Sequence, residues 1–229
     1  HQSLTFTEWQ ELDKGPQCKA DVISIATSMN VNKSHCTLAP EHLVHGGDTL
    51  AECYLYMSKP YFAGTVPTSM CTGVVTALYK TASRFRPVTS IPLCYQLCEQ
   101  THSNREGMMV VNHGSSRQFG GVKGRGAAEP LQELQLLIAD AAAHGKNLTI
   151  IYSDKTGAYD SINPAIFPVV YGRWHCPNHI SSRMASVASN HLRVVRTITG
   201  TKVIELGFPI ECGVPQGGIL SANRYQACH

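Results

Sequence analysis

Charged side chains are scarce in this chain of 229 residues. Asp, Glu, Lys and Arg make up 15% of it, against about 25% in a typical globular protein. The chain is also 43% hydrophobic, which excludes disorder of the whole, because disordered chains carry more charge and fewer apolar residues. Two interpretations of the scarce charge stay open. The surface is either rich in neutral polar side chains or partly covered by another molecule.

Long apolar runs are absent as well. Ser, Thr, Lys or Pro interrupts each apolar stretch, well short of the roughly 20 residues that cross a bilayer. We therefore predict no membrane span, and either one large domain or two small ones. The chain starts at His1, and its first thirty residues contain no basic segment followed by an apolar one. We expect no secretory signal, and a chain that is either processed or a fragment.

Cysteine occurs nine times, but without a C-x-x-C pair or the tight spacing of a disulfide framework. We predict reduced thiols in an intracellular, reducing compartment, which would be the nucleus, the cytoplasm or an organelle matrix. Cys94, Cys98 and His102 follow each other at intervals of four residues. They could line one helical face as metal ligands, but a fourth ligand is not evident. The favoured alternative is a buried stripe of small residues.

Basic residues are concentrated in two blocks. Residues 80–125 contain seven basic and two acidic side chains, and residues 161–229 contain six and two. The stretch 126–160 between them is acidic. A basic surface interrupted by a small acidic spot is what a polyanion-binding site with a cation-binding centre requires. Solvated helix faces give similar sums, so the pattern favours this function only together with motifs.

Hydrophobic periodicity predicts alternating helices and strands, and hence an α+β or α/β fold. Helices are expected from Asp48 to Gly64, Pro92 to Glu106, Ala127 to His144 and Pro177 to Thr197. A glycine-rich basic turn, Gly120–Gly126, leads into the third of these helices, which has the clearest apolar stripe. Strands are expected over Gly73–Lys80 and Phe85–Ser90, over Asn147–Ser153 as a buried strand, and over Thr197–Ile210 as a hairpin.

Two short motifs carry candidate chemistry. In Asp154-Lys-Thr-Gly-Ala-Tyr-Asp160 a carboxylate directly follows the expected buried strand. A rigid sheet would fix its oxygens for a hard cation such as Mg²⁺, although Asp154 could equally cap the next turn. In Gly213-Val-Pro-Gln-Gly-Gly-Ile-Leu-Ser221 glycine and proline force a defined turn. Such a loop lets the main chain approach a flat or phosphorylated ligand.

Taken in this order, the two motifs resemble the palm motifs D-x-x-x-[AG]-[FY]-D-[SA] and G-x-P-Q-G-x-x-L-S of reverse transcriptases. Further segments follow the running order of non-LTR (LINE-like) retroelement polymerases, and the resemblance covers about residues 30–221. These segments are Lys33-Ser34, His45-Gly-Gly-Asp48, Gly64-Thr-Val-Pro67, Thr76-Ala-Leu-Tyr-Lys80, Phe85-Arg-Pro-Val-Thr-Ser90 and Gln118-Phe-Gly-Gly-Val-Lys-Gly-Arg125.

The resemblance implies a right-hand polymerase fold of the α+β class. It divides the chain into an N-terminal arm (1–30), a fingers-like region (31–125) and a partial palm-like region (126–229). By the same resemblance Asp154 would be the catalytic residue and the Mg²⁺ ligand, and RNA or an RNA/DNA hybrid would be the partner. The residues implied to bind the nucleotide are Lys80, Arg86, Tyr159, Gln216 and Gly217, and those implied to contact nucleic acid are Lys123 and Arg125.

The third palm motif of the family, an aromatic-x-Asp-Asp hairpin, is missing. No Asp follows Asp160, and the only later acids, Glu205 and Glu211, precede Gln216. We therefore expect a retrotransposon-type RNA-directed DNA polymerase chain that is truncated before this motif and is not a nucleotidyltransferase by itself. The alternative is a retroelement-derived, domesticated subunit that has a structural or RNA-contacting role beside other proteins in a larger intracellular assembly.

Overall fold

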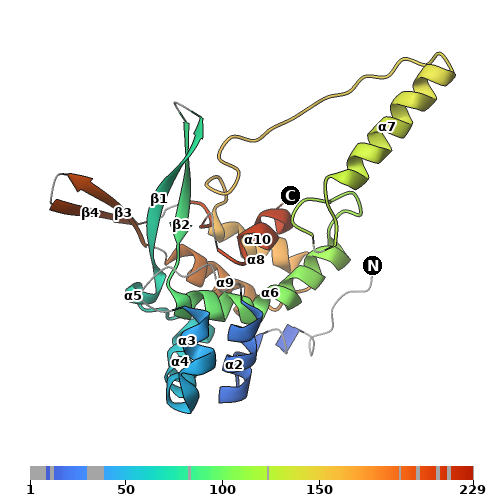
Figure 1. The fold of residues 1–229 in the computed structure, drawn as a ribbon. Coiled ribbons are helices and arrows are strands. Elements are labelled where there is room, and N and C mark those ends of the chain that lie inside the picture. The colour runs from blue at the N-terminus through green and yellow to red at the C-terminus, as the bar shows by residue number, and fades with distance from the viewer. Residues whose placement is uncertain are drawn as a thin grey trace.

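The structure, a computed structural model, describes residues 9–10, 13–29, 39–81, 84–122, 124–190, 192–199, 202–209, 212–215 and 218–228. Within these ranges nine α-helices and four strands form a mixed α+β fold (Figure 1). The first helices are α2 (Lys19–Ser28), α3 (Pro40–His45), α4 (Gly47–Phe62), α5 (Thr68–Cys71) and α6 (Leu93–His113). The later ones are α7 (Ala128–Ala143), α8 (Phe167–Gly172), α9 (Asn178–Ser189) and α10 (Ser221–Ala227), with a 3-10 turn, η1 (Pro164–Ile166), before α8.

The sheet has the strand order β2-β1-β3-β4. Its strands are β1 (Thr72–Thr81), β2 (Arg84–Ser90), β3 (Leu192–Thr199) and β4 (Lys202–Pro209). Two antiparallel hairpins, β1–β2 and β3–β4, are joined by parallel pairing of β1 with β3. One sheet therefore contains strands from both regions that the resemblance separates into fingers and palm.

Helix α6 joins two hydrophobic cores. Leu97 and Cys98 face the first core, which α2, α3, α4 and α5 complete. Met109, near the other end of α6, faces the second core, where α8 and α9 contribute Tyr171 and Ile180. The helix is therefore the scaffold against which both halves of the described chain are placed.

Several elements confirm the sequence-based predictions. Both hairpins form, and α4, α6 and α7 lie where periodicity places them, although Gly46 rather than Asp48 is the N-cap residue of α4. The helix predicted to extend to Thr197 ends at Ser189. The residues after it, including Val194 and Val195, are β-branched and join the sheet as β3, next to β1.

The prediction of a buried strand over residues 147–153 is wrong. These residues have no regular secondary structure, and Ile151 and Tyr152 are 87% and 81% exposed. A strand needs a partner, and the four described strands pair only with one another. Helix α7 projects from the body of the molecule, and the chain returns from its tip as an extended segment (Figure 1). The apolar side chains of α7 are consequently mostly exposed, apart from the buried Ala141 and the half-buried Leu134.

Candidate functional site

The two sequence motifs meet in space. The amide of Val214 donates a hydrogen bond to the carbonyl of Tyr159 (2.9 Å), and the amide of Gly213 donates one to the carbonyl of Ile162 (2.5 Å). Gly213 has φ +101°, and a Cβ there would lie 2.9 Å from the Cα of Asp160. Glycine is therefore required for this close main-chain approach. The motif loop, residues 212–221, thus rests on the turn of residues 156–161.

The described part of the motif loop is held in one conformation by its own polar groups. The hydroxyl of Ser221 donates to the carbonyl of Pro215 (2.6 Å), and the amide of Gly218 donates to the same carbonyl (3.0 Å). The amide of Ile219 donates to the carboxylate of Glu99 on α6 (2.8 Å). The loop is therefore attached to the central helix as well as to the turn.

Below the loop lies a buried ionic cluster that the sequence analysis missed. Arg224 of α10 lies with Nη1 3.4 Å from Glu99 Oε1 and with Nε 4.0 Å from Glu106 Oε1, and all three side chains are at most 1% exposed. The hydroxyl of Tyr171 donates to Glu106. Acids seven residues apart on a helix share a face. The spacing of Glu99 and Glu106, beside apolar residues, was therefore the sequence signal that could have indicated a buried pair of carboxylates.

Burial raises the pKa of both Glu99 and Glu106, and the charge of Arg224 opposes this rise. Glu99 additionally accepts main-chain hydrogen bonds, which favour its charged form. Two carboxylates share one guanidinium, so the ionised cluster carries a net negative charge in the protein interior. The cost of this charge is larger for Glu106, whose Oε2 has no hydrogen-bond partner.

We expect Glu106→Gln to flatten the dependence of stability on pH. A carboxyl whose folded pKa is raised stabilises the fold fully below its unfolded pKa, and this contribution is lost as the pH rises through the folded pKa. The free energy of unfolding of Glu106→Gln should therefore fall less than that of the wild type between about pH 5 and about pH 8. Urea unfolding at several pH values measures this, with the exposed Glu133→Gln as control. Identical slopes for Glu106→Gln and the wild type would contradict the assignment.

Tyr159 lies where the turn contacts the loop, and its side chain reaches the protein surface. Its ring is 5.4 Å from that of Tyr225 on α10, and both residues are partly exposed. Two neighbouring aromatic rings at a surface offer a place for a base to stack. Next to them Asp160 forms an ion pair of 3.0 Å with Arg193 of β3, which ties the turn to the sheet.

The other predicted site residues are not gathered around this contact by any described interaction. Asp154 is exposed and stands at the end of the extended segment rather than on a sheet. Arg86 is exposed on β2, and Lys80 stands at a β-bulge of the same hairpin, where only its main chain is described. Arg125 is exposed, but it donates to the carbonyls of Ser116 and Gln118. Lys123, Gln216 and Gly217 lie outside the described residues.

The described residues do not fit a Mg²⁺ site. No three His, Cys, Asp or Glu side chains among them are grouped as metal ligands. Asp160 is the nearest acid to Asp154 in the sequence, and its carboxylate already pairs with Arg193. Mg²⁺ in polymerase-type sites needs more than one carboxylate ligand or its equivalent from substrate. No catalytic step can therefore be derived through a metal ion held by these residues alone.

The second candidate metal site is a buried stripe. On the core face of α6 the side chains of Cys94, Cys98 and His102 are at most 9% exposed. Among the described residues they are not grouped with each other or with other side chains as three metal ligands. Burial raises the pKa of the Cys98 thiol well above its usual value, which disfavours the thiolate that binds metals. All eight cysteines that the structure describes are free thiols.

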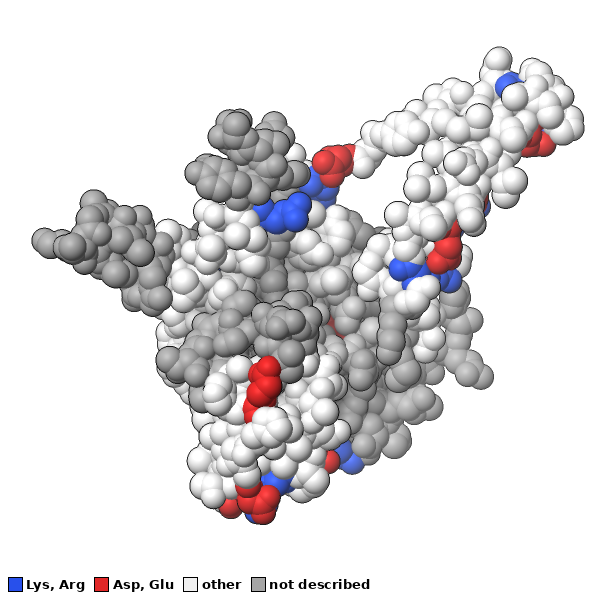
Figure 2. Space-filling model, viewed as in Figure 1, with Lys and Arg blue, Asp and Glu red and all other residues white. Residues whose placement is uncertain are grey.

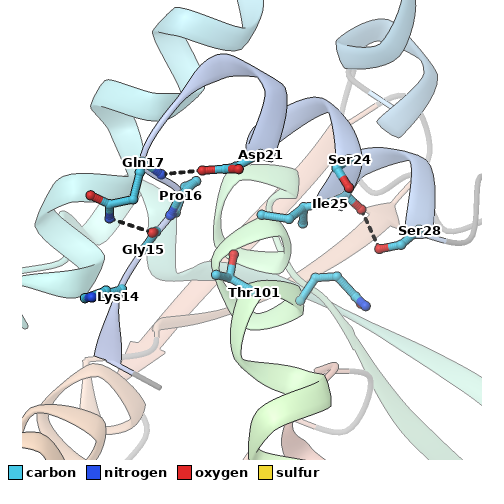
Figure 3. Close-up of a pocket in the computed structure, with 10 residues that line it drawn as sticks. Lys14, Gly15, Pro16, Gln17, Asp21, Ser24, Ile25, Ser28 and Thr101 are labelled. Carbon is cyan, nitrogen blue, oxygen red and sulfur yellow. Dashed lines mark hydrogen bonds between the residues drawn. The ribbon is translucent and has the colours of Figure 1, made fainter. Parts of the chain in front are cut away.

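A separate hollow of about 400 Å³ lies between α2 and α6 (Figure 3). Lys14, Asp21 and Thr101 are among its lining residues. The carboxylate of Asp21 accepts the main-chain amides of Gln17 (2.8 Å) and Cys18 (3.1 Å), which lower its pKa. With one basic and one acidic side chain the hollow favours neither anions nor cations. It contains none of the residues that the sequence motifs single out.

On the face shown in Figure 2 most described residues are uncharged. On this face the described Lys and Arg side chains form separate groups among neutral residues rather than one continuous stripe. Among the described residues no helix is both long and apolar enough to span a bilayer. No known protein-family model matches the sequence, and no curated protein shows significant similarity to it.

Proposed function

We propose that this chain is a reverse-transcriptase-like module that binds RNA or an RNA/DNA hybrid and does not extend a primer by itself. The observation that carries the proposal is the contact between Tyr159 and Val214, because it brings together the two motifs on which the resemblance rests. The motifs are separated by about fifty residues in the sequence. Two unrelated turns this far apart in the sequence would not be expected to lie in contact.

The exposed rings at this contact, together with exposed cations elsewhere on the described chain, suit a polynucleotide better than a small anion. Tyr159 and Tyr225 offer partly exposed rings for base stacking. Arg86 and Arg125 are exposed cations that can approach phosphates. We assign Lys80, Gln216 and Gly217 to the nucleotide and Lys123 to nucleic acid by resemblance alone.

A second candidate role is a contact subunit of a larger assembly. The observation that favours it is the row of exposed apolar side chains on α7 and on the segment that follows it. In either role we place the chain in a reducing intracellular compartment, which the free thiols support. The two roles are compatible, because the apolar surface and the Tyr159 contact involve different elements.

Binding of a fluorescently labelled RNA/DNA hybrid should weaken steeply with salt. Three phosphate contacts, from Arg86, Lys123 and Arg125, give a loss of affinity of about fortyfold between about 50 and 200 mM salt. Neutralising Arg86, Lys123 or Arg125 one at a time should reduce the slope of log K against log salt by about 1. Fluorescence anisotropy measures both quantities, and Lys59→Gln on α4 serves as the matched control.

A salt-independent affinity, or equal slopes for all variants and the control, would overturn the nucleic-acid part of the proposal. Primer extension with Mg²⁺ tests the other part, and we expect no product. Extension that Asp154→Ala abolishes would show that the chain polymerises after all.

A further inference from the structure

The extended segment, residues 146–154, exposes both its apolar side chains and its main chain. Ile151 and Tyr152 are the most exposed, and Leu148 and Ile150 are also more than one third exposed. Helix α7 adds four exposed apolar residues, Leu131, Leu136, Leu137 and Ile138. An apolar surface of this size on an otherwise ordered molecule marks an interaction site. No described strand pairs with the segment. Its one described main-chain hydrogen bond runs from the amide of Lys146 to the carbonyl of Ala141 (2.9 Å), so the rest of its main chain can pair with a β-strand.

We propose that the partner is a second copy of this chain, whose extended segment pairs antiparallel with the first about a two-fold axis at Ile150. A two-fold axis makes the interface self-complementary, so each pair of opposite residues occurs twice. This inference does not rest on the proposed function, because its test uses neither nucleic acid nor activity, although it includes Asp154, to which the resemblance gives a catalytic role.

The sequence of the segment is complementary to itself in this register. Lys146 lies opposite Asp154 of the second copy, Leu148 lies opposite Tyr152, and Thr149 lies opposite Ile151. Opposite charges, aromatic with aliphatic residues, and β-branched residues are the favourable cross-strand pairs. Because side chains alternate along a strand, Lys146, Leu148, Ile150, Tyr152 and Asp154 all share one face. That face therefore has an apolar centre with an ion pair at each end.

The charges select this register over its alternatives. Parallel pairing in register would place Lys146 beside Lys146 and Asp154 beside Asp154, which is unfavourable. An antiparallel shift of two residues would place Lys146 opposite Tyr152 and would lose both ion pairs. The present partner of Lys146 is Asp140 at 3.2 Å, and both side chains are more than half exposed. Such a solvated ion pair contributes little to stability. Lys146 can therefore leave Asp140 and pair with Asp154 of the second copy.

The area available matches a stable interface. The eight exposed apolar side chains of α7 and of the segment offer roughly 800 Å² per copy, which is the size that one partner buries in a standard interface. A two-stranded ribbon alone is only marginally stable. The proposed dimer therefore also buries the exposed apolar side chains of α7, as a second layer.

Charge reversal tests the proposal. Sedimentation velocity over a range of concentrations should show the wild type as a dimer. Lys146→Asp places two pairs of like charges in the interface and should raise the dissociation constant about tenfold or more, and Asp154→Lys should do the same. The double variant Lys146→Asp/Asp154→Lys restores opposite charges in the same register and should recover the wild-type constant.

Lys59→Asp on α4 makes the same charge change away from the segment and should leave the dimer intact. Circular dichroism should show the same secondary structure for all variants, because the reversed residues are exposed. A wild type that stays monomeric at every concentration would overturn the proposal. So would a dimer that neither single reversal weakens, or one that the double reversal does not restore.

Discussion

Replacing Arg224 by methionine should lower the free energy of unfolding by about 3–5 kcal/mol, the cost of breaking a buried ion pair on one side. The guanidinium is the cation described beside Glu99 and Glu106, and it is 1% exposed. Methionine fills a similar volume but leaves two carboxylates without a countercharge in the interior. Urea denaturation followed by far-ultraviolet circular dichroism measures the loss.

Arg117→Met provides the matched control. Arg117 is 82% exposed and pairs with Glu133 at 3.6 Å, so its loss should cost less than about 1 kcal/mol. The triple variant Glu99→Gln/Glu106→Gln/Arg224→Met removes the uncompensated charges and should regain much of the stability. If Arg224→Met costs no more than Arg117→Met, the cluster does not hold the fold together.

The buried cluster also explains how the motif loop keeps its position. Glu99 accepts the amide of Ile219 with one oxygen and faces Arg224 with the other. One carboxylate therefore links the loop to α10 and α6. The same helix joins both hydrophobic cores, so a change at Glu99 reaches the loop through rigid elements rather than through solvent. Stability of the body and geometry of the candidate site are coupled at this residue.

The elements that local pattern determines could be predicted from the sequence. The hairpins β1–β2 and β3–β4 and the helices α4 and α7 follow from alternation, periodicity and turn residues. These features depend on short stretches of chain.

Features that depend on distant residues could not be predicted. Residues 148–152 have the composition of a buried strand, yet strand formation requires a partner that local sequence does not specify. The ion pair of Glu99 with Arg224 joins residues 125 positions apart, and nothing in either neighbourhood identifies the other. The candidate catalytic role of Asp154 depended on the missing strand, so it remains a proposal drawn from resemblance.

Replacing Gly213 by alanine should lower the free energy of unfolding by about 2–4 kcal/mol, from the strained backbone and the overpacked contact together. The residue has φ +101°, and its new Cβ would lie 2.9 Å from the Cα of Asp160 and 3.2 Å from its carbonyl oxygen. Main-chain atoms cannot yield as a flexible side chain can. The loop should therefore move away from the turn, which breaks the hydrogen bond from Val214 to Tyr159.

Urea unfolding measures the loss of stability, and hydrogen exchange measures the opening of the turn. Gly145→Ala is the matched control, because Gly145 also has a positive φ (+61°) but nothing within 4 Å of a Cβ. It should cost only about 1–2 kcal/mol, the price of the backbone conformation alone. Faster exchange of the amides of residue 213 and of Val214, which donate to the turn, should appear in Gly213→Ala and not in Gly145→Ala. Equal costs and unchanged exchange in both variants would mean that the turn and the loop do not depend on each other, and the shared site would lose its structural basis.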